Sequence, residues 1–384
     1  MDMRTILERL IGFETVSHMT NVPLIRWVEG VLADAGINST LIFDASGQKA
    51  NLWARVGPDD VPGVILSGHV DVVPVEGQTW TRPPFALTQE GGRLYGRGTT
   101  DMKGFDACAI ALMLEAAKRD LKVPLILALS HDEEVGCRGV GSMIDAMAAW
   151  PVPPRFCIVG EPTGMEAAIG HKGKVALRAS CTGRAGHSSA APHALNAIHL
   201  AMDFGAAVRG LQAEIASAGP FDAEYDVPYS TLHIGKIHGG VQVNVVANVC
   251  VMDMEIRALA GDDPARQIAR LEAAAEAIVA PLRGRFPEAA IEVERLWDYP
   301  GLGTAPGADV VVFVKGLTGG NAHLKVAYGT EGGMFAQRLG LPTVICGPGA
   351  MAQGHMPDEY VELAQLARCE AMLAALMARC EAGF

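Results

Sequence analysis

The residues VILSGHVDVV, at positions 64–73, carry the pattern on which our prediction of the fold depends. The run is largely apolar and is bounded by Gly63 and Pro74, which is typical of a strand buried on both faces of a parallel sheet. His69 and Asp71 lie two positions apart, so an extended chain presents them on the same face. A carboxylate placed there can accept the second imidazole N–H and orient the ring for metal binding.

Apolar runs of the same kind follow at 123–130 (VPLILALS) and 155–160 (RFCIVG). Segments with helical spacing surround them, and these are residues 3–11, 21–36, 106–120 and 140–150. Strands that alternate with helices predict an α/β domain with a mostly parallel sheet.

The pattern changes after Lys174. Strand patterns at 175–183, 230–239, 247–257 and 289–298 combine with helical patterns at 196–215 and 263–282, where Asp263 precedes Pro264 as a plausible cap. The order β-α-β-β-α-β is that of a ferredoxin-like unit. We expect this unit to be an insertion at residues 174–298.

The α/β pattern resumes after the insertion. It consists of a helix at 309–319, the Gly-rich loop YGTEGG at 328–333, a helix at 334–340, a strand at 342–349 and a helix at 358–380. Residues 1–173 and 299–384 are therefore expected to form one discontinuous catalytic domain.

Composition excludes several kinds of partner. The chain has 384 residues, 49% of them hydrophobic, and a formal net charge of −12 without any Lys/Arg cluster. An acidic protein of this kind is a poor match for nucleic acid or for an anionic membrane. The 8 cysteines form no Cys-x-x-Cys pair, and no apolar run reaches the length of a membrane span. We expect a cytoplasmic protein with buried, reduced thiols.

Further acidic and imidazole side chains follow the predicted strands, and these are Asp101, Glu133, Glu134, Glu161 and His355. Each residue also has a structural interpretation without metal. An aspartate can cap a helix, two adjacent glutamates can be a solvated charge pair, and a histidine in a loop can be there without binding a metal. Their joint occurrence after successive strands favours a site for two metal ions, since carboxylates and imidazoles bind divalent metals. Hydrolysis is then the leading hypothesis.

Glu133 and Glu134 are adjacent, so their side chains point apart and suit different tasks. One would bind metal and the other would act on water. Competing chemistries fit less well, because GRGTTDMKG (96–104) lacks the glycine spacing of a phosphate loop and GHSSA (186–190) lacks the elbow of a serine hydrolase.

The motifs resemble those of the acetylornithine deacetylase and succinyl-diaminopimelate desuccinylase family of di-zinc metallohydrolases, which are relatives of aminoacylase and glutamate carboxypeptidase. The resemblance covers nearly the whole chain and rests on SGHVDVVP, GRGTTDMKG, HDEEVG, GEPT, GRAGHSS and GPG…GHMPDEY. The C-terminal part, from YGTEGG onward, looks most like acetylornithine deacetylase. The resemblance implies hydrolysis of an N-acyl-amino acid, with N-acetylornithine of arginine biosynthesis as the expected substrate.

The resemblance also implies a role for each motif residue. Asp101 would bridge two zinc ions, for which cobalt can substitute. His69 and Glu161 would complete the shell of one ion, and Glu134 and His355 that of the other. Glu133 would be the general base, and Asp71 would orient His69.

The inserted domain is expected, by the same resemblance, to serve as a lid and to form a homodimer. His187 would stabilise the oxyanion from the partner subunit, with His193 as a weaker candidate. Arg257 and Asn244 would bind the substrate carboxylate. Gly329 and Thr330 suggest a loop that approaches the substrate, and Glu331 could meet a cationic side chain.

Three functions remain open at this point. The first is an acetylornithine-type deacetylase. The second is a desuccinylase, another N-acyl-amino acid deacylase or a dipeptidase with the same chemistry. The third is a non-catalytic binding homologue, which is disfavoured because every expected ligand and the base are present.

Overall fold

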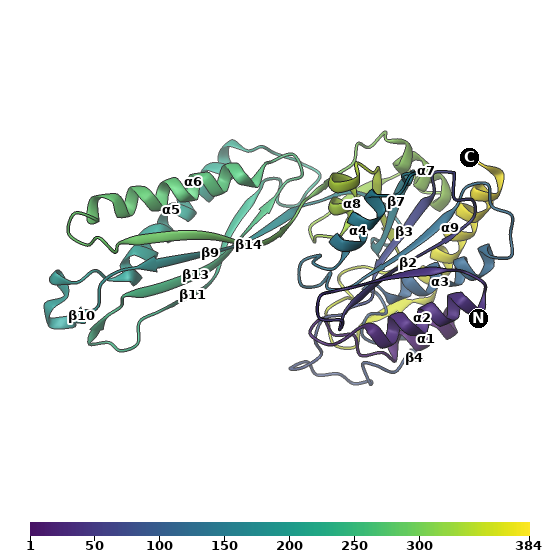
Figure 1. Ribbon diagram of the computed structural model, residues 1–384, viewed down its shortest axis with the longest axis horizontal. Helices are drawn as coiled ribbons and strands as arrows, with labels where there is room; N and C mark the ends of the chain where they lie inside the picture. Colours follow the sequence, from purple (N-terminus) through teal and green to yellow (C-terminus); the bar gives the residue numbers. More distant parts are fainter. The chain divides into compact units, whose positions relative to one another are not determined.

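The computed structural model describes residues 1–384 and divides the chain into two compact units. Unit 1 comprises Met1–Gly170, Leu302–Val326 and Thr330–Phe384. Unit 2 comprises His171–Gly301 together with Ala327–Gly329. The insertion expected at 174–298 falls inside the range of unit 2, which is teal and green in Figure 1.

Unit 1 is built on one large sheet whose four central strands are parallel. In spatial order they are β6 (Leu125–Ser130), β3 (Val64–His69), β7 (Phe156–Pro162) and β17 (Thr343–Gly347). Every residue of these strands is buried, as expected for a sheet covered on both faces. The outer strands are β1 (Ser39–Phe43), β2 (Ala50–Val56), β8 (Ala167–His171), β15 (Leu302–Gly303) and β16 (His323–Val326).

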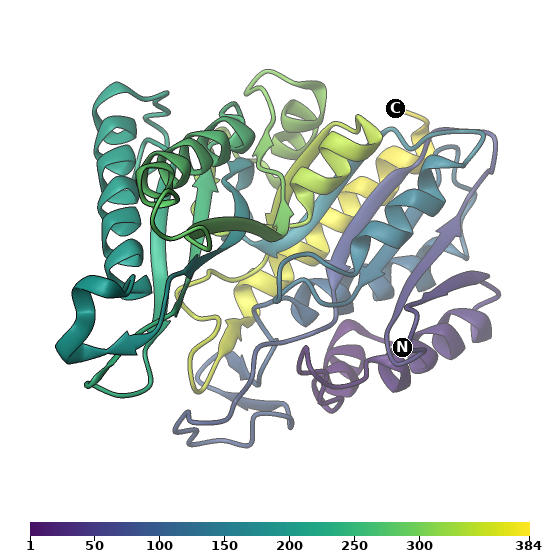
Figure 2. The same ribbon diagram turned by 60° about the vertical axis from the view of Figure 1, so that its left-hand side comes forward.

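Helices cover both faces of this sheet. On one face α3 (Lys103–Ala116) packs against β3, β6 and β7 and contacts α1 (Met3–Ile11) and α9 (Leu363–Ala382), the yellow helix of Figure 2. The other helices of unit 1 are α2 (Val22–Asp34), α4 (Val140–Ala148), α7 (Asp309–Thr318) and α8 (Gly332–Leu339). Val64 and Leu66 of β3 belong to the core that includes α1, α3 and α9, whereas Ile65 is buried but lies outside that cluster. Alternate side chains of the strand therefore pack into different layers.

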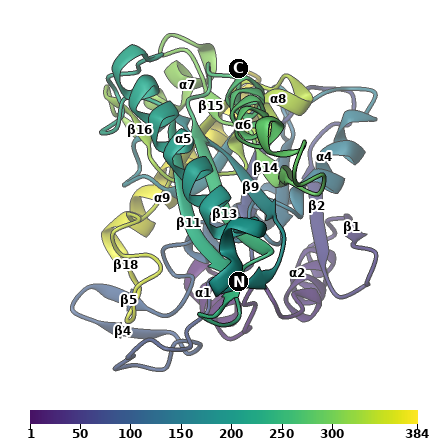
Figure 3. The same ribbon diagram turned by 90° about the vertical axis from the view of Figure 1, so that its left-hand side faces the viewer.

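Unit 2 has its own core and its own four-stranded sheet. Its elements along the chain are β9 (Gly173–Thr182), α5 (Ala197–Ala218), β11 (Thr231–Gly239), β13 (Val249–Ala258), α6 (Pro264–Val279) and β14 (Ala290–Tyr299). The strands lie in the order β11-β13-β9-β14 and are antiparallel, and α5 and α6 pack against the sheet (Figure 3). This confirms the predicted ferredoxin-like order. Asp263 caps α6 by accepting from Ala265 N at 2.9 Å, with Pro264 in the first turn.

Short elements complete both units. They are β4 (Thr88–Glu90), β5 (Arg93–Tyr95), β10 (Gly186–His187), β12 (Val245–Val246), β18 (Tyr360–Glu362) and the 3-10 helices at Ser188–His193 and Ala280–Leu282. The sequence patterns correctly indicate an α/β protein with a parallel centre and a ferredoxin-like insertion. They miss β1, β2 and β8, which are antiparallel to their neighbours within the large sheet.

Two predicted boundaries are wrong. The helix expected at 358–380 begins only at Leu363, because residues 360–362 form β18 and pair with β5. The strand expected at 64–73 ends at His69, beyond which the chain bonds to other segments, with Val72 N donating to Thr15 O at 3.0 Å. Both differences come from partners distant in sequence, which a local pattern does not contain.

The cysteines agree with the expected buried thiols, since all eight are free and buried. None of the helices combines the length and the hydropathy that a membrane crossing requires.

Candidate functional site

The candidate ligands of unit 1 converge at the carboxyl ends of the parallel strands. His69 is the last residue of β3, Glu161 lies near the end of β7, and Glu133 and Glu134 follow β6. Asp101 precedes α3. Because the carboxyl ends of parallel strands meet at one edge of a sheet, ligands from distant segments are brought together there.

Asp101 lies between two histidines. Its Oδ1 is 3.1 Å from His69 Nε2, and its Oδ2 is 3.0 Å from His355 Nε2. The alternative role of Asp101 as a helix cap is excluded, because α3 begins at Lys103 and no side chain caps it. The Asp101–Met102 peptide bond is cis. A carboxylate with one oxygen toward each histidine has the arrangement that a bridging ligand requires.

Glu134 and Glu161 lie on opposite sides of this aspartate. Glu134 Oε2 is 3.0 Å from His355 Nε2, whereas Glu161 Oε1 is 3.6 Å from His69 Nε2. His355 is thus a site residue and not merely a loop histidine.

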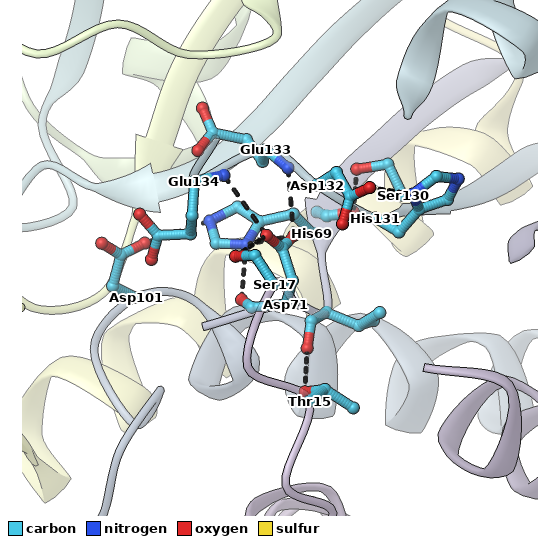
Figure 4. Close-up of polar contacts among 12 residues, drawn as sticks. Thr15, Ser17, His69, Asp71, Asp101, Ser130, His131, Asp132, Glu133 and Glu134 are labelled. Carbon is cyan, nitrogen blue, oxygen red and sulfur yellow. Dashed lines mark hydrogen bonds and ion pairs between the residues drawn. The ribbon is translucent and has the colours of Figure 1, made fainter. Parts of the chain in front are cut away.

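Glu133 and Glu134 point in different directions, as the sequence predicted (Figure 4). The Glu134 carboxylate turns toward Asp101, and the Glu133 carboxylate points away from it. Glu133, His69 and Glu161 nevertheless form one group whose potential metal-binding atoms all lie within 4.8 Å of one another. His69, Asp101 and Glu134 form a second group that meets the same distance. Geometry alone therefore permits Glu133 to be either a base or a ligand.

Asp71 supports the site in more ways than the sequence indicated. Its backbone carbonyl, at 3.0 Å, is closer to His69 Nδ1 than its carboxylate, at 3.6 Å. The carboxylate accepts the backbone N–H groups of Glu133 and Glu134 at 3.1 and 3.3 Å and the hydroxyl of Ser17 at 2.7 Å. Asp71 therefore positions the two glutamates as well as the histidine.

The histidines of the site have raised pKa values. Hydrogen bonds that His355 donates to the carboxylates of Asp101 and Glu134 raise the pKa of His355 to about 10. Burial lowers the pKa of His69, but the carboxylates of Asp101 and Asp71 outweigh it and hold that pKa well above the usual value. The same two histidines keep the pKa of Asp101 below its usual value against the opposing effect of burial.

The carboxyl groups show the opposite behaviour. Burial raises the pKa values of Glu133 and Glu161 well above the ordinary value, and burial together with Asp101 raises the pKa of Glu134 to about 7. Buried carboxylates are costly unless cations neutralise them. Oxygen and nitrogen donors gathered around His69 and Asp101 are therefore of the kind that divalent metal ions take as ligands.

Glu331 is not available to a substrate in the way we expected. It is 1% exposed, and its two oxygens accept from Ser130 Oγ at 2.5 Å and Ser67 Oγ at 3.4 Å. Ser67 is on β3 and Ser130 ends β6, so Glu331 joins two strands beneath the candidate ligands. The neighbouring Thr330 is also buried, and its hydroxyl accepts from Gly332 N at 3.0 Å.

The residues expected from the insertion lie in unit 2, where they form two separate groups. His187 pairs with Val245 in the β10–β12 ribbon, and Asn244 is the next residue, accepting from Ser188 N at 3.0 Å. His187 is exposed, and its Nδ1 lies 2.7 Å from Ser189 Oγ. The weaker candidate His193 is exposed at the end of the adjoining 3-10 helix.

Arg257 belongs to the second group. It bonds through Nε to Glu255 at 3.0 Å and through Nη1 to the Tyr299 hydroxyl at 3.0 Å, so it is not the free strand-end charge that we considered as an alternative. A Cβ on Gly329 would lie 2.1 Å from that hydroxyl. The close approach of Tyr299 therefore requires glycine at 329.

These two groups lie at opposite ends of the sheet of unit 2. Arg257 pairs with Lys174 near the start of β9, whereas the ribbon of His187 follows Thr182 at the end of β9. A strand rises about 3.3 Å per residue, so the separation along β9 is on the order of 26 Å. One small molecule cannot contact both groups of the same subunit.

Several supporting residues escaped the sequence analysis. Ser17 and Tyr299 carry no motif of their own. Arg97 and Glu359 bond to each other, and Glu359 accepts the backbone N–H of Asp101. Their position inside the quoted motifs GRGTTDMKG and GHMPDEY is the only sequence feature that could have indicated this role. Gln78 lies in no such motif.

Comparison with known proteins identifies the family. The model of peptidase family M20/M25/M40 matches residues 65–379. The chain belongs to this family. Among similar proteins, the acetylornithine deacetylase of Shigella sonnei is 33% identical over 350 residues, which cover 91% of this chain and 88% of that protein. The resemblance expected from the motifs is thereby confirmed.

Solved structures agree on the fold of this M20 enzyme. A metallo-carboxypeptidase of the M20 family from Sulfolobus solfataricus matches with a TM-score of 0.78 at 17% identity, covering 98% of this chain and 99% of that one. A dinuclear metal-binding peptidase of the M20 family from Bacillus subtilis matches with a TM-score of 0.70 at 15% identity, covering 100% and 98%. The protein is a metal-dependent amide hydrolase of family M20.

Proposed function

We propose that this enzyme removes the acetyl group of N-acetylornithine, releasing ornithine and acetate in arginine biosynthesis. The observation that carries the proposal is the 33% identity with an acetylornithine deacetylase across 91% of the chain. The geometry of unit 1 supports metal-dependent amide hydrolysis in general, since Asp101 lies between His69 and His355 and groups of carboxylate and imidazole donors lie close together.

The proposed cofactors are two zinc ions, which cobalt can replace. Asp101 would be shared, with His69 and Glu161 on one side and Glu134 and His355 on the other. When bound, such ions supply Lewis acidity, which activates water and stabilises charge on an acyl oxygen.

Glu133 is the proposed general base. Burial raises the pKa of its carboxyl group well above the usual value, which makes the carboxylate a better proton acceptor. The same carboxyl group can then return that proton to the leaving amine. Asp71 holds the Glu133 backbone and thereby the direction of the side chain.

A homodimer through unit 2 is proposed to complete the site. The separation of His187 and Asn244 from Arg257 supports this, because a single subunit could present only one of the two groups to a given substrate molecule. His187 would donate to the developing oxyanion from the partner subunit. Arg257, held by Tyr299 near Gly329, would bind the substrate carboxylate.

The edge of the sheet in unit 2 offers a surface for this contact. Strand β11 lies at one edge of this sheet. Ile237 near its end and Val241 and Val243 just beyond it are exposed apolar side chains. An unpaired apolar edge favours association with another chain. Ile237→Lys should convert the dimer to a monomer in analytical ultracentrifugation, and it should lower turnover as His187 is withdrawn. The matched control is Val312→Lys on α7, where the side chain is 59% exposed compared with 51% for Ile237. An unaltered dimer in Ile237→Lys would contradict the proposed interface.

A substrate panel tests the proposed reaction directly. Turnover of N-acetylornithine, N-acetylcitrulline, N-acetylmethionine and N-succinyl-diaminopimelate would be compared with zinc or cobalt added. We expect the highest kcat/KM for N-acetylornithine. A preference for another acyl-amino acid of tenfold or more would reassign the substrate within the same chemistry, and the absence of hydrolysis with zinc bound would refute catalysis of this class.

A further inference from the structure

Two candidate ligands, Asp101 and His355, come from distant segments, and three linked polar side chains join these segments. The first member of this set is Glu359, whose residue is 1% exposed. Its Oε1 accepts two consecutive backbone N–H groups, from Thr100 at 3.0 Å and from Asp101 at 3.1 Å. Glu359 therefore fixes the backbone at Asp101.

Arg97 is the second member. Its Nη1 donates to Glu359 Oε2 at 2.6 Å, and both side chains are at most 1% exposed. The guanidinium also lies over the ring of Trp80, at 5.0 Å from the centroid. The ion pair is thus enclosed by protein.

Gln78 extends the set to the other segment. Its Oε1 accepts from Arg97 Nη2 at 2.6 Å, and its Nε2 donates to the backbone carbonyl of His355 at 2.9 Å. His355 has a φ of 58°, a left-handed conformation that is unfavourable for most residues other than glycine. A backbone in this conformation persists only where its surroundings hold it.

We propose that Gln78, Arg97 and Glu359 are positioning residues that set the affinity of the site for the metal ion shared by Asp101, Glu134 and His355. The inference rests on the proposed function. The set holds the backbones of Asp101 and His355, whose side chains are 3.0 Å apart, in a fixed relation. Of the three, Gln78 contacts the His355 backbone but neither Asp101, His69 nor Glu161, so removing it should weaken the ion on the His355 side most.

Gln78 is the member best suited to mutation. Removing either partner of the buried Arg97–Glu359 pair would leave an uncompensated charge and could unfold the protein. Gln78 is only partly buried. Gln78→Ala removes the side-chain bonds to Arg97, Trp80 and His355. Gln78→Glu keeps an acceptor for Arg97 and Trp80 but places an oxygen against the His355 carbonyl.

The experiment is a cobalt titration of metal-depleted full-length protein, followed by absorption spectroscopy and calorimetry. We expect wild-type protein to bind two equivalents. In both Gln78 variants one equivalent should bind about 10- to 100-fold more weakly, as expected when the partner of a metal ligand is removed, while the affinity for the other changes much less. Excess cobalt should restore kcat with the same KM. Gln89→Ala, an exposed glutamine of β4, is the control and should match wild type.

Two results would overturn the inference. Either both equivalents bind the Gln78 variants as tightly as wild type, or both weaken together with a lower melting temperature of the metal-free protein, which would indicate a purely structural role. Failure of the proposed function would look different, because wild-type protein would then bind fewer than two equivalents or leave every acyl-amino acid intact.

Discussion

Glu133 and Glu134 are neighbours in the chain but differ in their surroundings. Asp71 accepts the backbone N–H of each, which leaves one carboxylate directed at Asp101 and the other directed away. Replacing Glu133 by glutamine should keep two metal ions per subunit and reduce kcat by about 10²- to 10⁴-fold, because the proton acceptor is lost. Metal analysis and steady-state kinetics on one preparation measure both quantities.

The companion variant Glu134→Gln is the control for this experiment. It should lower the metal content, since Glu134 faces His355 and Asp101. A Glu133→Gln protein that loses metal would instead identify Glu133 as a ligand.

Glu331 leads to a different expectation at the same scale. Its oxygens are occupied by Ser130 and Ser67, so Glu331→Gln should leave the preference between N-acetylornithine and neutral N-acetylcitrulline unchanged. Glu331→Ala should lower the free energy of unfolding by about 1–3 kcal/mol, because the buried serine hydroxyls lose their acceptor. Competition kinetics and urea denaturation provide the two measurements. A changed preference in Glu331→Gln would place the carboxylate in contact with substrate.

At the scale of elements, strand β3 has close contacts on both of its faces at Ser67 and Gly68, the two residues before His69. Ser67 bonds to Glu331 on one face, and on the other a Cβ at Gly68 would lie 1.9 Å from Asp106 Oδ1 of α3. Burial raises the pKa of Asp106 well above the usual value, and neither of its oxygens has a hydrogen-bond partner. Helix α3 and strand β3 therefore approach each other without room for a side chain.

Gly68→Ala should destabilise unit 1 by about 1–3 kcal/mol, as expected when a packed core is overfilled. Gly30→Ala is the matched control, because Gly30 lies in α2 with no atom within 4 Å of its added Cβ. It should be neutral or stabilise by up to about 1 kcal/mol through helix propensity. Urea midpoints compare the two variants. Equal midpoints for both would show that Asp106 moves aside without cost.

At the scale of the whole molecule, stability should depend jointly on pH and metal. Hydrogen bonds raise the pKa of His355 to about 10, so its contribution to the metal-free fold is complete below pH 6.5 and disappears as pH rises through 10. Burial raises the pKa of Glu134 to about 7, and its contribution is lost between pH 4.5 and 7. Deprotonation of both groups weakens the metal-free protein and strengthens metal binding.

The increase in melting temperature on adding zinc to chelator-treated protein should therefore be larger at pH 8 than at pH 6. Scanning calorimetry at both values measures it. The Glu134→Gln variant should show a smaller difference between the two pH values. An increase that is larger at pH 6 would contradict the assignment of these groups as ligands.

Much of this architecture could be predicted from sequence because its signals are local. Continuous apolar runs identify the central parallel strands, and the polar residues that follow them identify the candidate ligands. The roles of Ser17, Gln78 and Tyr299 could not be predicted, since each depends on a contact across tens or hundreds of residues. The burial of Glu331 was missed for the same reason, because its partners Ser67 and Ser130 lie on strands that are distant from it in sequence.

The eight buried cysteines have a practical consequence. Burial raises the pKa values of thiols such as Cys157 and Cys346, which keeps them in the unreactive protonated form. The thiols of the native enzyme should therefore react very slowly with maleimides. A single cysteine introduced at Met202, which is 63% exposed on α5, would accept a spin label without prior removal of any native thiol. Distances measured between such labels would test the proposed homodimer without interference from the native thiols.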